Sequence, residues 1–112
     1  MRITFVSLSK WSKKINGSGL LAYVECSYNQ LVGMFDEPTI KTDEYKTNAE
    51  WHIEVRHDDK FKGVLSLYDY KEPHSPVDHP DEVIEWHIGG RDIRLALELV
   101  DFITTPATIQ TK

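Results

Sequence analysis

An imidazole, two glycines and a guanidinium lie close together near the end of the chain, in the stretch His87-Ile88-Gly89-Gly90-Arg91. Gly89 and Gly90 permit a tight backbone turn, and the first N–H groups of a helix that begins after them can bind an anion. Arg91 can add a bidentate contact to a phosphate or carboxylate. The pattern predicts a small anion site, unless Asp92 itself caps the helix and leaves no vacancy.

Tyrosines beside lysines form a second candidate set. Tyr45 precedes Lys46, and Tyr68 and Tyr70 share one strand face just before Lys71. Such pairs suit stacking on a ring plus contact with a phosphate. They equally suit a strand edge on which lysine opposes aggregation. The predicted ligand-binding residues are Tyr45, Lys46, Tyr68, Tyr70, Lys71, His87, Gly89, Gly90 and Arg91.

The histidines offer a different chemistry. His52 and His87 lie on the polar faces of their strands, and neighbouring strands would bring them together with carboxylates for acid–base work or metal binding. His74 and His79 lie in a proline-rich loop with two aspartates. Neither set has the spacing of a metal-ligand template, so we predict no metal site. No nucleophile or phosphate-loop motif occurs, so enzyme activity and a cofactor are not predicted.

Charge and composition narrow the partners. The first 14 residues hold four basic residues and no acidic one, so the remaining chain carries nine basic against 18 acidic residues. A phosphate-backbone binder should be basic, so direct nucleic-acid binding is not expected. Cys26 is the single cysteine and excludes an internal disulfide, which fits a reducing compartment. No apolar run approaches the ~18 residues of a membrane span, and residues 1–8 do not resemble a signal peptide.

The elements that must position these residues follow from periodicity. We predict strands over 2–9, 20–26, 49–57, 63–70 and 82–88, and helices over 28–35 and 91–103. The turn signal at 15–19 suggests a hairpin between the first two strands. Residues 36–47, 57–63 and 71–81 are expected to be loops. The fold class is therefore α+β, an antiparallel sheet of about five strands (β-β-α-β-β-β-α) with two helices on one face.

Several side chains are assigned to the core. Trp51 and Trp86 lie in phase with the isoleucines of their strands, so both should face inward. In the second helix, the apolar stripe comprises Ile93, Ala96, Leu97, Val100 and Ile103, widened by Leu95, Leu99 and Phe102. Ser27 and Gln30 form a capping-box pattern at the start of the first helix. A single domain over 1–104 with a flexible tail over 105–112 is expected.

Four stretches together resemble a family of small proteins encoded by tailed bacteriophages. They are "MFDEPT" at 34–39, "DEYKTNAEWHIEV" at 43–55, "LSLYDYK" at 65–71 and "IEWHIGGRD" at 84–92. The resemblance covers roughly residues 31–101 and implies expression in the cytoplasm of an infected bacterial host. It carries no firmly assigned activity, so it transfers no catalytic residue. By analogy with other small phage accessory proteins, it implies a role in blunting host defence.

Three functions remain open. The first is a counter-defence binding protein that sequesters a small anionic, nucleotide-like ligand, with a homo-oligomer enclosing it. The second is an acidic protein–protein inhibitor or nucleic-acid mimic that acts on a host defence protein. The third is a small hydrolase or metal protein that uses His52 and His87. The helix mouth at Arg91 and the nearby rings favour the first.

Overall fold

The computed structural model describes residues 1–9, 19–41, 48–70 and 75–105. These residues form β1 (Ile3–Ser7), β2 (Gly19–Ser27), α1 (Tyr28–Phe35), β3 (Ile40–Lys41), β4 (Ala49–His57), β5 (Lys60–Tyr68), β6 (Val83–Gly90) and α2 (Ile93–Thr104). The predicted α+β class and the order of the elements are confirmed, with the short β3 added within the expected loop at 36–47. Residues 106–112 of the predicted tail lie outside the described residues.

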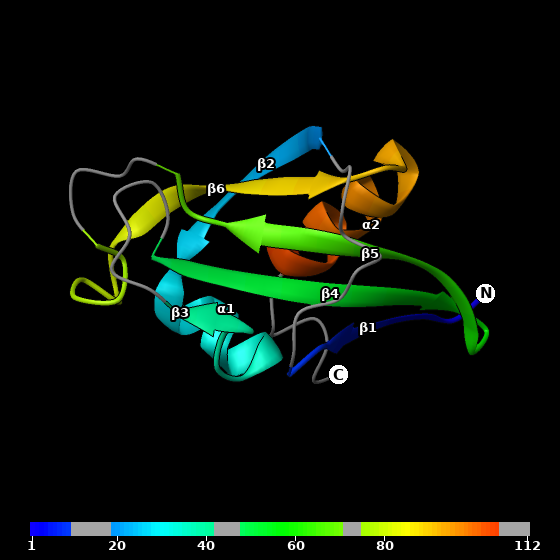
Figure 1. Ribbon diagram of the computed structural model, residues 1–112, viewed down its shortest axis with the longest axis horizontal. Helices are drawn as coiled ribbons and strands as arrows, with labels where there is room; N and C mark the ends of the chain where they lie inside the picture. The colour runs from blue at the N-terminus through cyan, green and yellow to red at the C-terminus, as the bar shows by residue number, and fades with distance from the viewer. Residues whose placement is uncertain (10–18, 42–47, 71–74, 106–112) are drawn as a thin grey trace.

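All strands join one antiparallel sheet in the order β1-β4-β5-β6-β2, and β3 pairs with β4 (Figure 1). The hairpin expected between the first two strands is wrong. β1 pairs with β4, from Ile3 opposite His57 to Ser7 opposite Ile53, whereas β2 pairs with β6 at the other edge. Both strands have an apolar face, and burying it in the core determines which strands pair. Each of the two strands therefore pairs with a strand distant in the sequence and not with the other.

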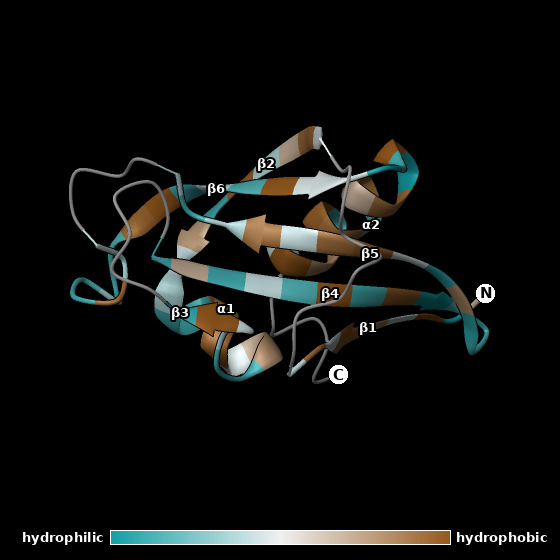
Figure 2. Ribbon diagram, viewed as in Figure 1, coloured by the Kyte–Doolittle hydropathy of each residue, from teal (hydrophilic) through white to brown (hydrophobic). Residues whose placement is uncertain are grey.

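The two faces of the sheet differ in character. Along β4, the side chains of Trp51, Ile53 and Val55 are fully buried on the core face, as the period of two predicted. Figure 2 shows the corresponding alternation of hydrophilic and hydrophobic residues along this strand. Register then extends each face across the sheet, because residues directly opposite on paired strands share a face. We call the face opposite Trp51 the outer face.

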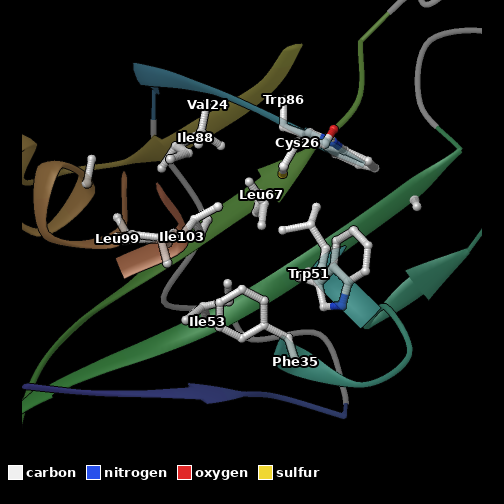
Figure 3. Packing of buried hydrophobic residues seen from close by; sticks show 14 of the residues in the cluster. Val24, Cys26, Phe35, Trp51, Ile53, Leu67, Trp86, Ile88, Leu99 and Ile103 are labelled. Carbon is white, nitrogen blue, oxygen red and sulfur yellow. Dashed lines mark hydrogen bonds between the residues drawn. The ribbon is translucent and has the colours of Figure 1, made fainter. Parts of the chain in front are cut away.

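Both helices cover the core face. α1 contributes Tyr28, Leu31 and Phe35 to the buried cluster, and α2 contributes Leu95, Ala96, Leu99 and Ile103. The two tryptophans are fully buried in this cluster, as predicted, which also contains residues of β2, β5, β6 and both helices (Figure 3). Neither helix in the described ranges has the length and apolar character that a membrane crossing requires.

The start of α1 follows its sequence signal closely. The Ser27 hydroxyl accepts a hydrogen bond from the Gln30 backbone N–H at 3.2 Å, and the Gln30 side chain accepts one from the Ser27 N–H at 2.8 Å. Two N–H groups at the helix start are thus satisfied reciprocally, which confirms the predicted capping box.

The buried stripe of α2 is narrower than predicted. Ile93 and Leu97 are 45% and 55% exposed, so their assignment to the inward stripe is wrong. Leu95, Leu99 and Ile103 form the side of the helix that faces the sheet. The apolar residues at one margin of the predicted stripe are therefore exposed to solvent. α2 begins at Ile93 rather than at 91 because Asp92 is its N-cap.

The connection between β4 and β5 is tighter than the loop predicted over 57–63. Only Asp58 and Asp59 separate the strands, and both have positive φ, 50° and 68°. Two consecutive residues of positive φ are typical of the two-residue turns that match the twist of a hairpin. β5 therefore begins at Lys60, which moves Phe61 and Lys62 from the expected loop into the strand.

Candidate functional site

Gly89 and Gly90 are the last two residues of β6, not a turn between strand and helix as expected. They pair with Leu20 and Gly19 of β2. A Cβ on Gly89 would lie 2.7 Å from the Ser66 hydroxyl oxygen, and one on Gly90 would lie 2.8 Å from a methyl carbon of Leu65. Close packing against β5, rather than backbone freedom, therefore accounts for the glycine pair.

The mouth of α2 is closed by the protein's own carboxylate. Asp92 accepts a hydrogen bond from the Arg94 backbone N–H at 2.9 Å, so the alternative of a self-capped helix is the one present. The Arg94 side chain also donates to both oxygens of Asp92, from Nε at 3.2 Å and from Nη2 at 3.1 Å. These bonds hold the pKa of Asp92 below its ordinary value. The helix N–H groups thus do not supply the expected anion contact. Of the two contacts predicted at this helix start, the side chain of Arg91 is the one still to be considered.

Arg91 lines a pocket of about 320 Å³ between the first half of β5 and the start of α2. Its lining comprises residues 61–65 of β5 together with Arg91, Asp92 and Leu95; we call it the Arg91 pocket. Leu65 and Leu95 are almost completely buried and provide apolar wall, and the Phe61 ring is 44% exposed. Lys62 and Arg91 are both exposed and bring two cations to the same pocket.

The net charge near this pocket depends on the ion pair between Asp92 and Arg94. Among the described residues that line the pocket, Asp92 is the only acidic one, and its carboxylate is bound by Arg94, which is not part of the lining. A carboxylate held by a guanidinium offers little attraction to Lys62 and little repulsion to an incoming anion. The pocket therefore combines apolar wall, one aromatic ring and two cationic groups, which suits a planar ligand that bears an anionic group.

His87 lies on the outer face, away from the Arg91 pocket. Its ring contacts three tyrosines: the ring centroids of Tyr23, Tyr70 and Tyr68 lie 5.0, 5.4 and 5.5 Å from its own. We call these four residues the tyrosine–histidine face. Burial raises the pKa of Tyr68, and the nearby Glu50, Tyr23 and Tyr70 raise it further. The Tyr68 phenol is therefore a neutral hydrogen-bonding group at physiological pH.

His52 does not meet His87. β5 separates their strands, and His52 pairs with Ser66 whereas His87 pairs with Tyr68, one row along the sheet. His52 is completely buried, with its Nε2 2.5 Å from a carboxylate oxygen of Glu50. Within the described ranges, no group of three or more His, Cys, Asp or Glu residues is arranged to hold a metal ion.

The predicted ligand-binding residues therefore fall into separate groups. Arg91 belongs to the pocket, Tyr68, Tyr70 and His87 belong to the tyrosine–histidine face, and the glycines pack inside the sheet. Tyr45, Lys46 and Lys71 lie outside the described residues.

Sequence reasoning missed Lys62, Phe61 and Tyr23. The loop predicted over 57–63 includes Phe61 and Lys62, although the alternation of apolar and polar residues across 60–68 extends the strand to include them. Tyr23 contacts His87 because β2 pairs with β6, and no pattern of neighbouring residues in the sequence predicts that pairing.

Comparison of the chain with protein-family models, with curated proteins and with solved structures found no match. The geometry of the two surfaces is thus the basis for assigning a function.

Proposed function

We propose that this protein sequesters a small anionic ligand with a planar, nucleotide-like ring in the Arg91 pocket. The observation that carries the proposal is the joint presence of Arg91, Lys62 and the Phe61 ring in one pocket of about 320 Å³. Arginine binds phosphate in a bidentate manner, and an aromatic ring offers a stacking surface for a base. No catalytic group is required for this function.

Volume limits the size of the ligand. Small-molecule sites usually span about 300–1,000 Å³, so this pocket lies at the lower limit. It suits one base with one phosphate or carboxylate, and a dinucleotide would leave its second half in solvent. A homo-oligomer that pools two pockets remains a prediction for the larger ligands.

The net charge of −5 opposes the approach of an anion from a distance. Screening limits that opposition, because the Debye length is about 8 Å at physiological ionic strength. Within the pocket the nearest charges are those of Lys62, Arg91 and the Arg94-paired carboxylate of Asp92, so local contacts decide the affinity. Binding should therefore weaken with salt less steeply than in a protein that attracts its ligand by a broad basic surface.

A counter-defence role, in which a nucleotide-derived signal is removed inside an infected bacterium, is the biological part of the proposal. It is supported by the resemblance to small phage proteins and not by any feature of the pocket. The pocket chemistry and the biological role are separable, and the first is testable with purified protein.

The test is calorimetric titration with adenosine monophosphate, guanosine monophosphate, a cyclic dinucleotide, inorganic phosphate and uncharged adenosine. We expect a nucleotide to bind more tightly than adenosine or phosphate alone, because ring and anion are both recognised. Arg91→Ala should weaken binding tenfold or more, since a charge-assisted bond contributes about 1.5–3 kcal/mol. Arg2→Ala is the matched control, because Arg2 is exposed and lies outside the pocket lining.

The variant Arg94→Ala should have an affinity between those of the wild-type protein and Arg91→Ala. It removes the partner of Asp92 and leaves that carboxylate free to repel the anion, so a smaller loss of affinity is expected. Absence of heat from every ligand at saturating concentration, or equal losses for Arg91→Ala and Arg2→Ala, would reject the proposal.

A further inference from the structure

Three members of the tyrosine–histidine face, all except Tyr70, belong to a row of side chains that crosses four strands. Tyr23 of β2 lies opposite His87 of β6, His87 lies opposite Tyr68 of β5, and Tyr68 lies opposite Glu50 of β4. All four share the outer face, since each has a sequence neighbour buried in the core: Val24, Trp51, Leu67 and Trp86. The row places three aromatic rings and a carboxylate in line across the open side of the sheet.

The rings of this face are accessible to a partner. Tyr23 is 50% exposed and Tyr70 is 39% exposed, whereas His87 is half-buried between them. Exposed tyrosines that are held in place by neighbouring rings lose little conformational entropy on binding. Tyrosine is also among the residues that contribute most to the energy of protein interfaces.

A pair of like charges borders the rings. Glu25 of β2 and Glu85 of β6 lie directly opposite one another, two residues along from Tyr23 and His87 and on the same outer face. Both are exposed, and neither forms an ion pair with any residue that the structure describes. Like charges directly opposite in an antiparallel pair destabilise the sheet. A cation bound between them would relieve this repulsion.

We propose that the tyrosine–histidine face, together with Glu25 and Glu85, binds an arginine side chain of a basic partner protein. The guanidinium stacks on the exposed ring of Tyr23 and donates hydrogen bonds to the two carboxylates. Two residues along a strand span about 7 Å, so the side chains of Glu25 and Glu85 can reach a guanidinium that lies over the Tyr23 ring. This surface is distinct from the Arg91 pocket and independent of the ligand proposed there.

Arginine fits this face better than other cationic groups. Its planar guanidinium is weakly hydrated, stacks on aromatic rings and presents several donors at once, whereas the lysine ammonium is a compact and strongly hydrated charge. Nucleic acid is excluded as an occupant by charge, because Glu25 and Glu85 repel phosphates. A metal ion makes no use of the aromatic rings.

The experiment measures binding of a fluorescent nona-arginine peptide by anisotropy, with nona-lysine as the peptide of equal charge. Wild-type protein should bind nona-arginine at least tenfold more tightly than nona-lysine. The double variant Glu25→Gln/Glu85→Gln should lose at least tenfold in affinity for nona-arginine. Its control is Asp59→Asn/Asp101→Asn, which removes the same charge from exposed positions elsewhere and should lose less than threefold.

Tyr23→Leu tests the aromatic part of the surface. It keeps a shorter apolar side chain but removes the aromatic ring, and it should abolish the preference for arginine over lysine. Circular dichroism and thermal unfolding confirm that each variant is folded, and if Tyr23→Leu does not fold, the glutamate double variant and its control decide the matter. Equal losses in the two double variants, or equal binding of the two peptides by wild-type protein, would overturn the proposal.

Discussion

Trp51 and Trp86 meet edge to face in the core, with ring centroids 5.5 Å apart and an interplanar angle of 71°. Each indole N–H has a backbone acceptor at 3.0 Å: Trp51 donates to the carbonyl of Asp36, and Trp86 donates to the carbonyl of Cys26. The pair thus ties α1's C-terminal cap and β2 to the centre of the sheet. Fully buried aromatic residues with satisfied N–H groups contribute strongly to stability.

Replacing Trp86 by phenylalanine should lower the free energy of unfolding by about 2–4 kcal/mol, since it leaves a cavity and deprives a buried carbonyl of its donor. Urea denaturation followed by far-UV circular dichroism measures the change. Leu97→Ala is the control: Leu97 is 55% exposed on α2, so its loss should change stability by less than about 0.5 kcal/mol. Similar losses for both variants would contradict the buried position of Trp86.

Two glycines should respond in opposite directions to alanine. Gly89→Ala should cost about 1–3 kcal/mol, because its Cβ would lie 2.7 Å from the Ser66 hydroxyl oxygen in a packed region. Gly33→Ala should stabilise the protein by up to about 1 kcal/mol, because Gly33 is within α1 and a Cβ there meets nothing within 4 Å. The difference in thermal midpoint between the two variants is the measurement, and a stable Gly89→Ala protein would refute the close approach.

The Cys26 thiol should make stability fall at alkaline pH. Burial raises its pKa to about 12, whereas the thiol of an unfolded chain ionises near 8.5. The stabilising contribution is therefore complete below about pH 8.5 and is lost as pH rises toward 12, since thiolate forms only in the unfolded chain. Cys26→Ala should flatten the decline in the free energy of unfolding between pH 8 and 10.5. Rapid reaction of the native thiol with a disulfide reagent at pH 8 would contradict this.

Removing the guanidinium of Arg94 should raise the pKa of Asp92 toward that of a free aspartate. Hydrogen bonds from the Arg94 side chain and backbone are the main causes of the low Asp92 pKa, and the variant Arg94→Ala keeps only the backbone bonds of residues 94 and 95. An NMR titration of the Asp92 carboxyl carbon in both proteins gives the two values. Any stability that this carboxylate contributes is present above its ordinary pKa and is lost as pH falls through the lowered one. An unchanged Asp92 pKa would remove the argument for a cationic Arg91 pocket.

Local signals predicted the local elements of this fold. The alternation over 49–57 and the capping box at Ser27 depend only on residues near one another in sequence, and both predictions are confirmed. The pairing of β2 with β6 was not predicted, because many apolar strands are acceptable partners until the core is assembled. The hairpin expected between the first two strands was wrong for this reason.

The candidate sites were predictable only in part, for the same reason. His87 was placed correctly on the polar side of its strand, but its contact with Tyr23 requires the β2–β6 register. Arg91 was chosen for its place before a helix, yet the pocket depends on Lys62 and Phe61, which reach it through the packing of α2 against β5. The type of side chain was enough to single out individual candidate residues. Which of those residues lie in one site depends on tertiary packing, which the sequence pattern does not reveal.

The β2–β6 pairing also sets an order of events during synthesis. Cys26 and Trp86, which lie on these two strands, are 60 residues apart in the chain. At about 5–20 residues per second, β2 leaves the ribosome about 3–12 s before its partner exists. During that interval the segment from Gly19 to Ser27, with Glu25 as its single charge, is an unpaired apolar strand. Among the strands that the structure describes, β2 therefore spends the longest time during synthesis with its edges unpaired.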